Sequence, residues 1–397
     1  MNHLRWSWAA ILLLLTFLVP RIVHGVRPER RLPLVALDKT VPFENRLEQR
    51  SFFWLLDHLK IVKDDGSRYD VDRDYIGTEP APRAGDPPVR TRDLVDADVE
   101  RARLLYLIDT YGVYEGDLAS GSAMRAALER SRKIYGGLTA EEARAVRRAA
   151  DNGVTVLAEF NTWASPTGAA ARTIMEELLG VRWTHWLGRY FPDLDDEGDV
   201  PGWLRRNYER EWSKPWEFRG PGYALVRDDE AVEVLLPGRH VRHPGLTLER
   251  SRPVDPLLAD AHDGVPYFYW FDVVEPAEKT RVLAQYAWHL KPEGERRLRA
   301  RGLPVRFPAV TLRANGRSGA APASCYYLAG DFADNVLGER GVPLAGYLRL
   351  RSWLPSTDQS FFWRFYAPMM RELLREHAEP VPRPVENDRV ADASVGR

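Results

Sequence analysis

The sequence predicts an α/β protein whose core is a doubly wound, mostly parallel β-sheet, carrying a β-rich, aromatic insertion. Short apolar runs of strand length are each followed by a segment with helical spacing, which is typical of a parallel sheet covered on both faces. A segment dense in Trp and Tyr interrupts this alternation over residues 181–320. A buried-strand pattern and an amphipathic helix return at 321–378, so the insertion lies within the core rather than after it.

Composition and charge limit the functional classes. Of the 397 residues, 44% are hydrophobic and 28% charged, as in a globular protein. With 56 Lys and Arg against 57 Asp and Glu, the net charge of −1 gives no whole-chain basis for nucleic-acid binding, and we expect none. The single cysteine, Cys325, excludes an internal disulfide and a zinc site built on several cysteines. It lies in the apolar run SCYYLAGDF, which favours a buried structural thiol over a nucleophile.

Residues 1–31 have the features of a signal peptide or membrane anchor. Arg5 precedes an apolar run from Trp8 to Val19 that is shorter than the ~20 residues of a membrane span. We therefore expect an extracytoplasmic protein, either secreted or periplasmic, or anchored to the membrane by its N-terminus. More positive charge follows the run than precedes it, and for a retained anchor this favours the opposite, cytoplasm-facing orientation. The arginines concerned are Arg21, Arg27, Arg30 and Arg31.

Residues 32–180 form the first part of the predicted core. Residues 34–37 (LVAL) are a buried-strand candidate, and residues 45–61 follow with apolar side chains at helical spacing. A loop-rich stretch at 64–88 holds one short strand, and 104–108 (LLYLI) is a second buried strand. A helix over 139–152 begins with a capping box, in which Thr139 and Glu142 satisfy early backbone amides.

The stretch 153–179 is the most informative of the chain. A strand at 154–158 ends in polar residues, a turn with Ser165, Pro166 and Gly168 follows, and an amphipathic helix closes the unit. Open α/β sheets bind ligands at such a strand-to-helix junction. This junction has no Cys, no GxSxG motif and no glycine-rich phosphate loop, so it indicates the place of a site without indicating a reaction.

The insertion at 181–320 contains both helical and strand patterns. We expect a helix at 203–212, a β-hairpin from 223–226 and 232–236, aromatic strands at 267–274 and 282–290, and a charged helix at 291–302. Residues 237–264 are predicted as a loop. The aromatic residues fit the interior of a large core, and alternatively a groove that stacks on sugars.

The C-terminal part returns to the core and then ends in a tail. A buried strand is predicted at 324–329 and an amphipathic helix at 361–376, with Asp358 and Ser360 as candidate caps. The Pro-rich, charged residues 379–397 are predicted to be disordered.

Polar residues follow each predicted parallel strand, and the carboxyl ends of parallel strands share one edge of the sheet. The candidate catalytic residues are Glu159, Asp331 and Asp109, since a buried carboxyl beside a second one provides the acid and base of a glycosidase. The candidate substrate-binding residues are Asp38, Lys39, Tyr111, Asn161, Thr162 and Trp163. The alternative is that these residues cap helices or form structural ion pairs.

No cofactor or metal site is predicted. The acidic run FPDLDDEGD lacks the position-12 glutamate of a calcium loop, and acidic runs without ligand spacing usually face solvent. His240 and His243 are three residues apart in a loop, a spacing that is common by chance.

Three phrases carry a family resemblance: LDKTVP (37–42), AEFNTWASPT (158–167) and YYLAGDFAD (326–334). Together with the order of strands and helices, they resemble the class I glutamine amidotransferase-like superfamily, with its flavodoxin-like sheet, over residues 33–376. The closer likeness is to an extracytoplasmic bacterial family, without an assigned activity, found beside polysaccharide-processing proteins. The Cys-His-Glu triad of the amidotransferases does not carry over. Phe160-Asn161-Thr162 stands where the resemblance would place the nucleophile, and His377-Ala378-Glu379 follows the last helix. Glutamine hydrolysis is therefore disfavoured.

These observations predict an exported or anchored hydrolase that acts on a cell-envelope glycan or related carbohydrate through Glu159 with Asp331 or Asp109. An alternative is a non-catalytic envelope module that binds a glycan or a protein through the aromatic insertion. A third possibility, if the N-terminal anchor is retained with the body in the cytoplasm, is a membrane-bound transferase or regulator. In the first two cases the expected partner is a glycan or another envelope component.

Overall fold

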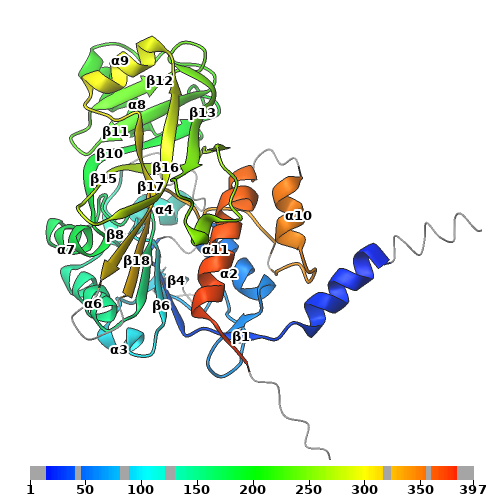
Figure 1. Cartoon of the computed structure of the whole chain (residues 1–397). Helices are drawn as coiled ribbons and strands as arrows, with labels where there is room; N and C mark the ends of the chain where they lie inside the picture. Colours follow the sequence, from blue (N-terminus) through cyan, green and yellow to red (C-terminus); the bar gives the residue numbers. More distant parts are fainter. Residues whose placement is uncertain are drawn as a thin grey trace, which may run out of the picture.

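The computed structural model describes residues 15–40, 46–80, 89–120, 130–315, 323–338, 340–354 and 359–381. Its centre is a ten-stranded mixed sheet (Figure 1). In spatial order the strands are β14 (Val265–Pro266), β13 (Val241–Arg250), β16 (Arg281–Leu290), β17 (Arg306–Asn315), β18 (Ala323–Leu328), β9 (Thr155–Ala158), β6 (Leu104–Asp109), β2 (Leu34–Asp38), β4 (Ile76–Pro80) and β5 (Val89–Thr91).

Five neighbouring strands of this sheet, β18, β9, β6, β2 and β4, are parallel. They are buried because their runs are apolar throughout; every residue of β6 is buried, for example. Numbered along the chain, their spatial order is 2-1-3-4-5. The expected strands at 34–37, 104–108, 154–158 and 324–329 are all among them.

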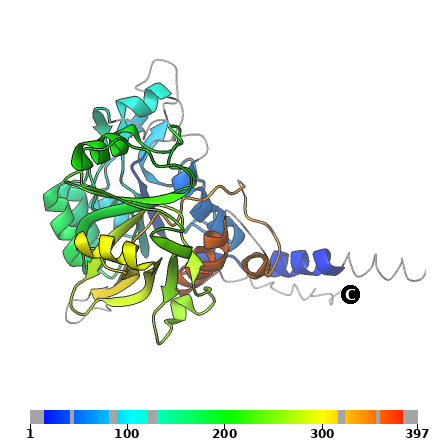
Figure 2. The ribbon, with the colours of Figure 1, turned by 90° about the horizontal axis from the view of Figure 1, so that it is seen from above.

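Helices cover both faces of this parallel part. On one side lie α3 (Asp96–Val99), α6 (Ala140–Asp151) and α7 (Ala169–Leu179), and on the other lie α2 (Leu47–His58) and α11 (Ala367–His377) (Figures 1 and 2). The predicted capping box is present: the Glu142 amide donates to Thr139 Oγ1 at 3.1 Å, and the Thr139 amide donates to Glu142 Oε2 at 2.9 Å. A five-residue π-helical segment, Phe362–Tyr366, leads into α11.

The other half of the sheet is antiparallel, and here the prediction of a mostly parallel sheet is wrong. Strands β17, β16, β13 and β14 pair antiparallel in series beyond β18, so much of the insertion extends the central sheet. Residues 237–264, predicted as a loop, contain β13. The register of β13 against β16 shifts between Val241 and Leu246, and this irregularity accommodates Pro244 and Gly245.

The rest of the insertion forms a separate four-stranded antiparallel sheet with its own apolar cluster. Its strands are, in spatial order, β12 (Val232–Leu235), β11 (Gly222–Arg227), β10 (Val181–Phe191) and β15 (Phe271–Pro276). The predicted hairpin is confirmed as β11 and β12, and the predicted helices are confirmed as α8 (Gly202–Trp212) and α9 (Pro292–Ala300). Most of the aromatic residues named in these clusters are buried or half-buried in the core.

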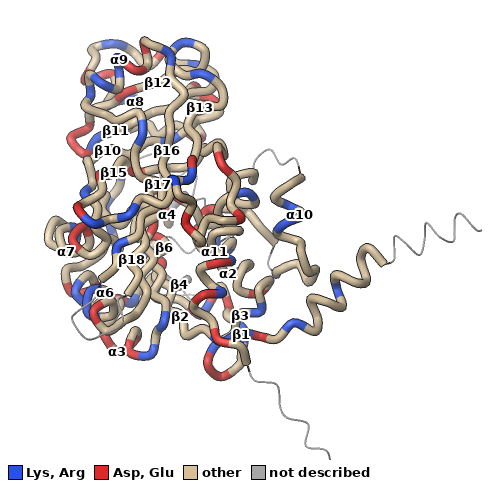
Figure 3. The backbone as a smooth tube through the Cα atoms, viewed as in Figure 1, with Lys and Arg blue, Asp and Glu red and all other residues tan. Residues whose placement is uncertain are grey.

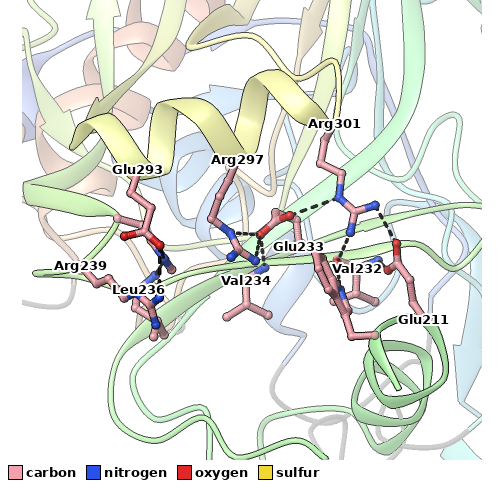
Figure 4. Close-up of polar contacts among 11 residues, drawn as sticks. Glu211, Val232, Glu233, Val234, Leu236, Arg239, Glu293, Arg297 and Arg301 are labelled. Atoms are coloured by element: carbon pink, nitrogen blue, oxygen red, sulfur yellow. Dashed lines mark hydrogen bonds and ion pairs between the residues drawn. The ribbon is translucent and has the colours of Figure 1, made fainter. Parts of the chain in front are cut away.

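Basic and acidic residues are interspersed along the chain of the body (Figure 3). One group of them fastens α9 to the four-stranded sheet (Figure 4). Buried Glu233 of β12 accepts from Arg297 Nε at 2.5 Å and from Arg301 Nε at 3.2 Å. Arg301 also donates to Glu211 of α8 at 2.6 Å, and both arginines lie over the Trp212 ring. Glu233 thereby joins α9 to β12, and Arg301 links α9 to α8 through Glu211.

Short elements complete the chain. A small sheet orders β19 (Glu379–Pro380), β1 (Arg30–Arg31) and β3 (Ile61–Val62), so the first residues of the predicted disordered tail pair with a strand, while 382–397 lie outside the described residues. Asp358, a candidate cap, also lies outside them. The remaining elements are β7 (Val113–Tyr114), β8 (Lys133–Tyr135), α4 (Glu115–Ser120), a 3-10 turn at Pro256–Leu258 and α10 (Tyr347–Trp353).

Residues 15–26 form a helix that projects from the body (Figures 1 and 2). Residues 1–14, the rest of the predicted signal or anchor, are outside the described part. Within the described ranges, no helix has the length and apolar character needed to cross a bilayer.

Candidate functional site

The carboxyl edge of the parallel strands gathers six acidic side chains, which we call the carboxylate cluster. Four were predicted: Asp38 ends β2, Asp109 ends β6, Glu159 directly follows β9, and Asp331 follows β18. The strand order brings them to one edge as expected. Glu48 and Asp334 complete the cluster, and the charges of its members act on one another.

Asp38 and Asp109 are the centre of the cluster. They are register partners on adjacent strands, so two carboxyl groups stand side by side in a buried place. Burial, with like charge from Asp38, raises the pKa of Asp109 to about 8. Burial raises the pKa of Asp38 to about 6, against the lowering effects of the Thr40 amide and the Arg46 guanidinium. At neutral pH the two groups therefore differ in protonation.

Asp331, Asp334 and Glu48 extend the cluster. Burial and the neighbouring carboxylates hold the pKa of Asp331 well above its ordinary value, with Asp334 the largest like-charge contributor. Burial raises the pKa of Asp334 to about 6, although Arg189 and a hydrogen bond with Asp331 lower it. Asp334 Oδ1 is buried and has no hydrogen-bond partner. The pKa of Glu48 is also raised well above its usual range by burial and by Asp38, Asp334 and Asp109.

Sequence reasoning missed Glu48 and Asp334 as site residues. Glu48 lies in the first turn of α2, the helix that follows β2, and such a first turn lies at the carboxyl edge of the sheet. Asp334 is only three residues beyond Asp331 in the same loop. Their positions could have identified them, because both are acidic residues in the first helical turn or the loop that follows a parallel strand.

Glu159 is held by three hydrogen bonds and is only 1% exposed. Its Oε1 accepts from the Tyr106 hydroxyl, and its Oε2 accepts from the amides of Phe332 and Ala333, both at 3.1 Å. Burial raises the pKa of Glu159 to about 8, despite the lowering effect of these donors. The side chain thus fixes the loop that carries Asp331 and Asp334.

Tyr111 and Asn161 surround Asp109. The Tyr111 amide donates to Asp109 Oδ1 at 2.5 Å, and Asn161 Nδ2 lies 3.3 and 3.4 Å from the two carboxylate oxygens. Asn161 has a φ of 69°, a left-handed conformation that asparagine tolerates better than most residues. The Tyr111 ring packs against Tyr114 with centroids 5.0 Å apart. Both predicted substrate-binding residues therefore lie at the cluster.

The polar groups of Lys39, Thr162 and Trp163 have partners inside the protein. Buried Lys39 forms ion pairs with Glu142 at 2.7 Å and with Asp93 at 3.1 Å. Thr162 Oγ1 donates to the Glu159 carbonyl at 2.6 Å, and Trp163 Nε1 donates to the Tyr327 hydroxyl at 2.5 Å. For these three residues a substrate-binding role stays a prediction.

Residues of the four-stranded sheet lie beside the cluster. The Trp270 ring stacks on Phe160 at 6.2 Å with an interplanar angle of 14°, and its carbonyl accepts from the Asp331 amide at 3.0 Å. Arg189 of β10 lies over the Trp270 ring and pairs with Asp199 at 2.7 Å. The insertion thus supplies an aromatic ring and a cation next to the acidic groups.

The groups that an amidotransferase would need lie elsewhere. Cys325 is buried in the middle of the sheet, in register with Val156, and burial raises the pKa of its thiol to about 12. His377 lines a cavity of about 630 Å³ at the amino ends of β9 and β18, together with Arg148 and Ser324. Among the described residues, no group of three or more His, Cys, Asp and Glu is arranged to hold a metal ion.

Comparisons with known proteins give distant structural likenesses. No family profile and no curated protein matches the chain. A cytoplasmic protein from Salmonella typhimurium LT2 is similar with a TM-score of 0.36 and 10% identity, over 87% of this chain and 99% of that one. A protein from Bacteroides uniformis described as ThuA-like gives a TM-score of 0.36 and 10% identity, over 87% and 92%. These values are too low to assign this chain a family or a reaction.

Proposed function

We propose that this protein is a hydrolase of a cell-envelope glycan or a related carbohydrate and acts through the carboxylate cluster. The observation that supports this most is the difference in pKa within the cluster, about 8 for Asp109 and about 6 for Asp38 and Asp334. Near neutral pH, one carboxyl is then protonated while others are ionised. Glycoside hydrolysis uses such a pair, a proton donor to the leaving oxygen and a carboxylate base or nucleophile.

In this proposal Asp109 is the general acid. Its partner is Asp334, because one oxygen of that carboxylate has no hydrogen-bond partner and remains free to accept a proton. Glu159, expected from sequence to be catalytic, acts instead as a positioning residue, since its Oε2 accepts from the loop amides of Phe332 and Ala333 and its Oε1 from Tyr106. Trp270, stacked on Phe160, supplies an aromatic ring beside the cluster.

The test measures hydrolysis of peptidoglycan and soluble envelope polysaccharides by the reducing ends that are released. Asp109→Asn and Asp334→Asn are each expected to lower the rate by at least about 100-fold, the usual contribution of a general acid or base. Asp272→Asn is the matched control: Asp272 is also buried, with a pKa raised to about 7, but it binds Tyr327 outside the cluster. Wild-type rates in Asp109→Asn would contradict the proposal.

The second candidate is a binding module without catalysis, favoured by the complete hydrogen bonding of Glu159 and by the stacked pair of Phe160 and Trp270. It predicts glycan binding, measured by titration calorimetry, with no reducing ends released. Trp270→Ala should then weaken glycan binding. Neither the wild-type protein nor the Asp109→Asn variant should release reducing ends.

We further infer that the parallel strands and their two helical layers form a doubly wound core of the amidotransferase-like type. The 2-1-3-4-5 strand order supports this.

We also propose that the body lies outside the cytoplasm, secreted, periplasmic or held by the N-terminal segment. Alkaline phosphatase fused after residue 381 should be active if the body is exported, while activity of a cytoplasmic reporter at that position would overturn the proposed location.

A further inference from the structure

Helix α10 and the residue after it expose large apolar side chains, with the Trp353 ring packed edge-on against His262 at 5.2 Å between centroids. Trp353 is 71% exposed, Leu350 58% and Leu354 40%. Its other side is packed: Leu348 is buried, and the Tyr347 ring lies 5.7 Å from that of Trp363. Scattered exposed leucines are ordinary, but a Trp and two Leu within one short segment form a contiguous apolar face.

The helix over residues 15–26 lies beside α10. The Ala345 amide, just before α10, donates to the Pro20 carbonyl at 3.0 Å, and both helices stand on the same side of the body in two views (Figures 1 and 2). The N-terminal helix also exposes apolar side chains, including Phe17, Val19 and Ile22. The sequence that precedes it, from Trp8 to Leu14, is apolar throughout. The apolar face of α10 therefore continues toward a segment with the composition of a membrane anchor.

The two helices themselves carry charge of one sign. Neither helix contains an acidic residue, and each carries arginine (Figure 3). Arg21 and Arg349 are exposed and form no ion pair within the described ranges, unlike most arginines of the body. Helices that lie in the interface of an anionic membrane combine Leu and Trp with Arg residues that have no acidic partner.

We propose that α10 and the helix at 15–26 form a membrane-contact face, with α10 lying in the interface of an anionic bilayer. Leu350 and Trp353 enter the boundary between headgroups and acyl chains, and Arg349 meets the lipid phosphates. The body is then held against the membrane at two points rather than tethered by the N-terminus alone. This inference does not depend on hydrolase activity.

A probe attached at α10 tests the contact directly. Because Cys325 is fully buried, Leu350→Cys provides a single reactive thiol for an environment-sensitive fluorophore in the full chain. With vesicles of phosphatidylcholine and about one-third phosphatidylglycerol, we expect a blue shift and quenching by spin-labelled lipid. Val305→Cys, half-exposed near α9, is the matched control and should keep its aqueous spectrum. A water-like spectrum at position 350 while the chain is vesicle-bound would overturn the proposal.

Binding strength gives a second measure. In vesicle co-sedimentation, Leu350→Ser combined with Trp353→Ser should weaken binding by about tenfold, and Arg349→Gln by about fivefold. Val305→Ser should not change binding. The Arg349→Gln effect should vanish on pure phosphatidylcholine. Unchanged binding in the double variant would overturn the proposal, and a dimer in solution that the double variant dissociates would show that α10 contacts a second copy of the chain instead.

Discussion

At the scale of single residues, the fold places Asp38 and Asp109 next to each other where neither can be well solvated. Adjacent parallel strands end at the same level, and their register makes these two residues partners. A pair of ionised carboxylates in a buried place is costly, so one of them keeps its proton near neutral pH. That retained proton is the property on which the proposed acid catalysis depends.

Asp109→Asn removes this ionisation and keeps the shape of the side chain. We expect the free energy of unfolding at pH 8 to rise by at least about 1 kcal/mol, since one unit of pKa shift corresponds to about 1.4 kcal/mol. At pH 5 the change should be smaller, because the cost of the raised pKa accumulates from the ionisation of the unfolded chain at about pH 4 up to the folded pKa of about 8. Urea unfolding at both pH values measures it. Equal effects at the two pH values would contradict the assignment of a raised pKa.

Glu159 provides a second prediction at this scale. Glu159→Ala leaves the buried Ala333 amide without an acceptor and the Phe332 amide with only the Gly330 carbonyl, and the loss of a buried acceptor costs about 1–3 kcal/mol. Glu159→Gln retains an acceptor oxygen and should cost about 1 kcal/mol or less. Hydrogen exchange of the two amides should rise in the alanine variant only. Similar stability of the alanine variant and wild type would show that Glu159 does not anchor the loop.

At the scale of secondary-structure elements, the sequence predicts the parallel half of the sheet well and the antiparallel half poorly. Strands β2, β6 and β9 are buried on both faces, so their sequences are continuously apolar and easily recognised. Strands β13 and β17 contain Pro244 and Pro308, and their irregular register against β16 tolerates both. Proline in a strand argues for a loop unless the pairing is known, and pairing is not visible in one sequence.

The same reasoning explains how much of the site was predictable. The carboxyl edge, with Asp38, Asp109 and Asp331, follows from strand ends alone. The roles do not, because they depend on contacts between segments distant in sequence. Glu159 is predicted to be catalytic from its position, and only its bonds to Tyr106 and the 332–333 amides reveal an anchoring role.

Helix α9 gives the prediction at this scale. Glu233→Ala removes the buried carboxylate that joins Arg297 and Arg301 to the four-stranded sheet. We expect a loss of about 3 kcal/mol in urea unfolding, as is usual when one partner of a buried pair is removed. Arg299→Ala, on the same helix, breaks an exposed pair with Glu295 and is the control. Equal effects of the two substitutions would indicate that Glu233 does not hold the helix.

At the scale of the whole molecule, two sets of buried groups make stability depend on pH in opposite directions. The cluster carboxyls have raised pKa values, about 6 for Asp38 and Asp334 and about 8 for Asp109 and Glu159. His58 and His24 join the N-terminal helix to α2, with rings 5.7 Å apart, and burial lowers their pKa values, to about 4 for His58.

The signs of the two effects define the profile. The folded protein holds carboxyl protons that the unfolded chain releases near pH 4, so this stabilisation is lost as pH rises through 6 to 8. The unfolded chain instead protonates its histidines below about pH 6.5, so the stabilisation from neutral His58 is lost as pH falls toward 4. Only the carboxyl effect operates between pH 6.5 and 8.5. The free energy of unfolding should therefore fall across that interval by about 1.4 kcal/mol per pH unit for each proton released. The thermal midpoint should fall with it.

Two variants separate these contributions. Asp109→Asn with Glu159→Gln should flatten the decline between pH 6.5 and 8.5. His58→Gln should flatten the acid limb only, because its ring has no cluster carboxylate among the groups that shift its pKa. Scanning calorimetry in buffers of matched ionic strength from pH 4.5 to 8.5 measures both. A thermal midpoint that rises from pH 6.5 to 8.5 would mean that the cluster is ionised in the folded state, and the acid role of Asp109 would fall with it.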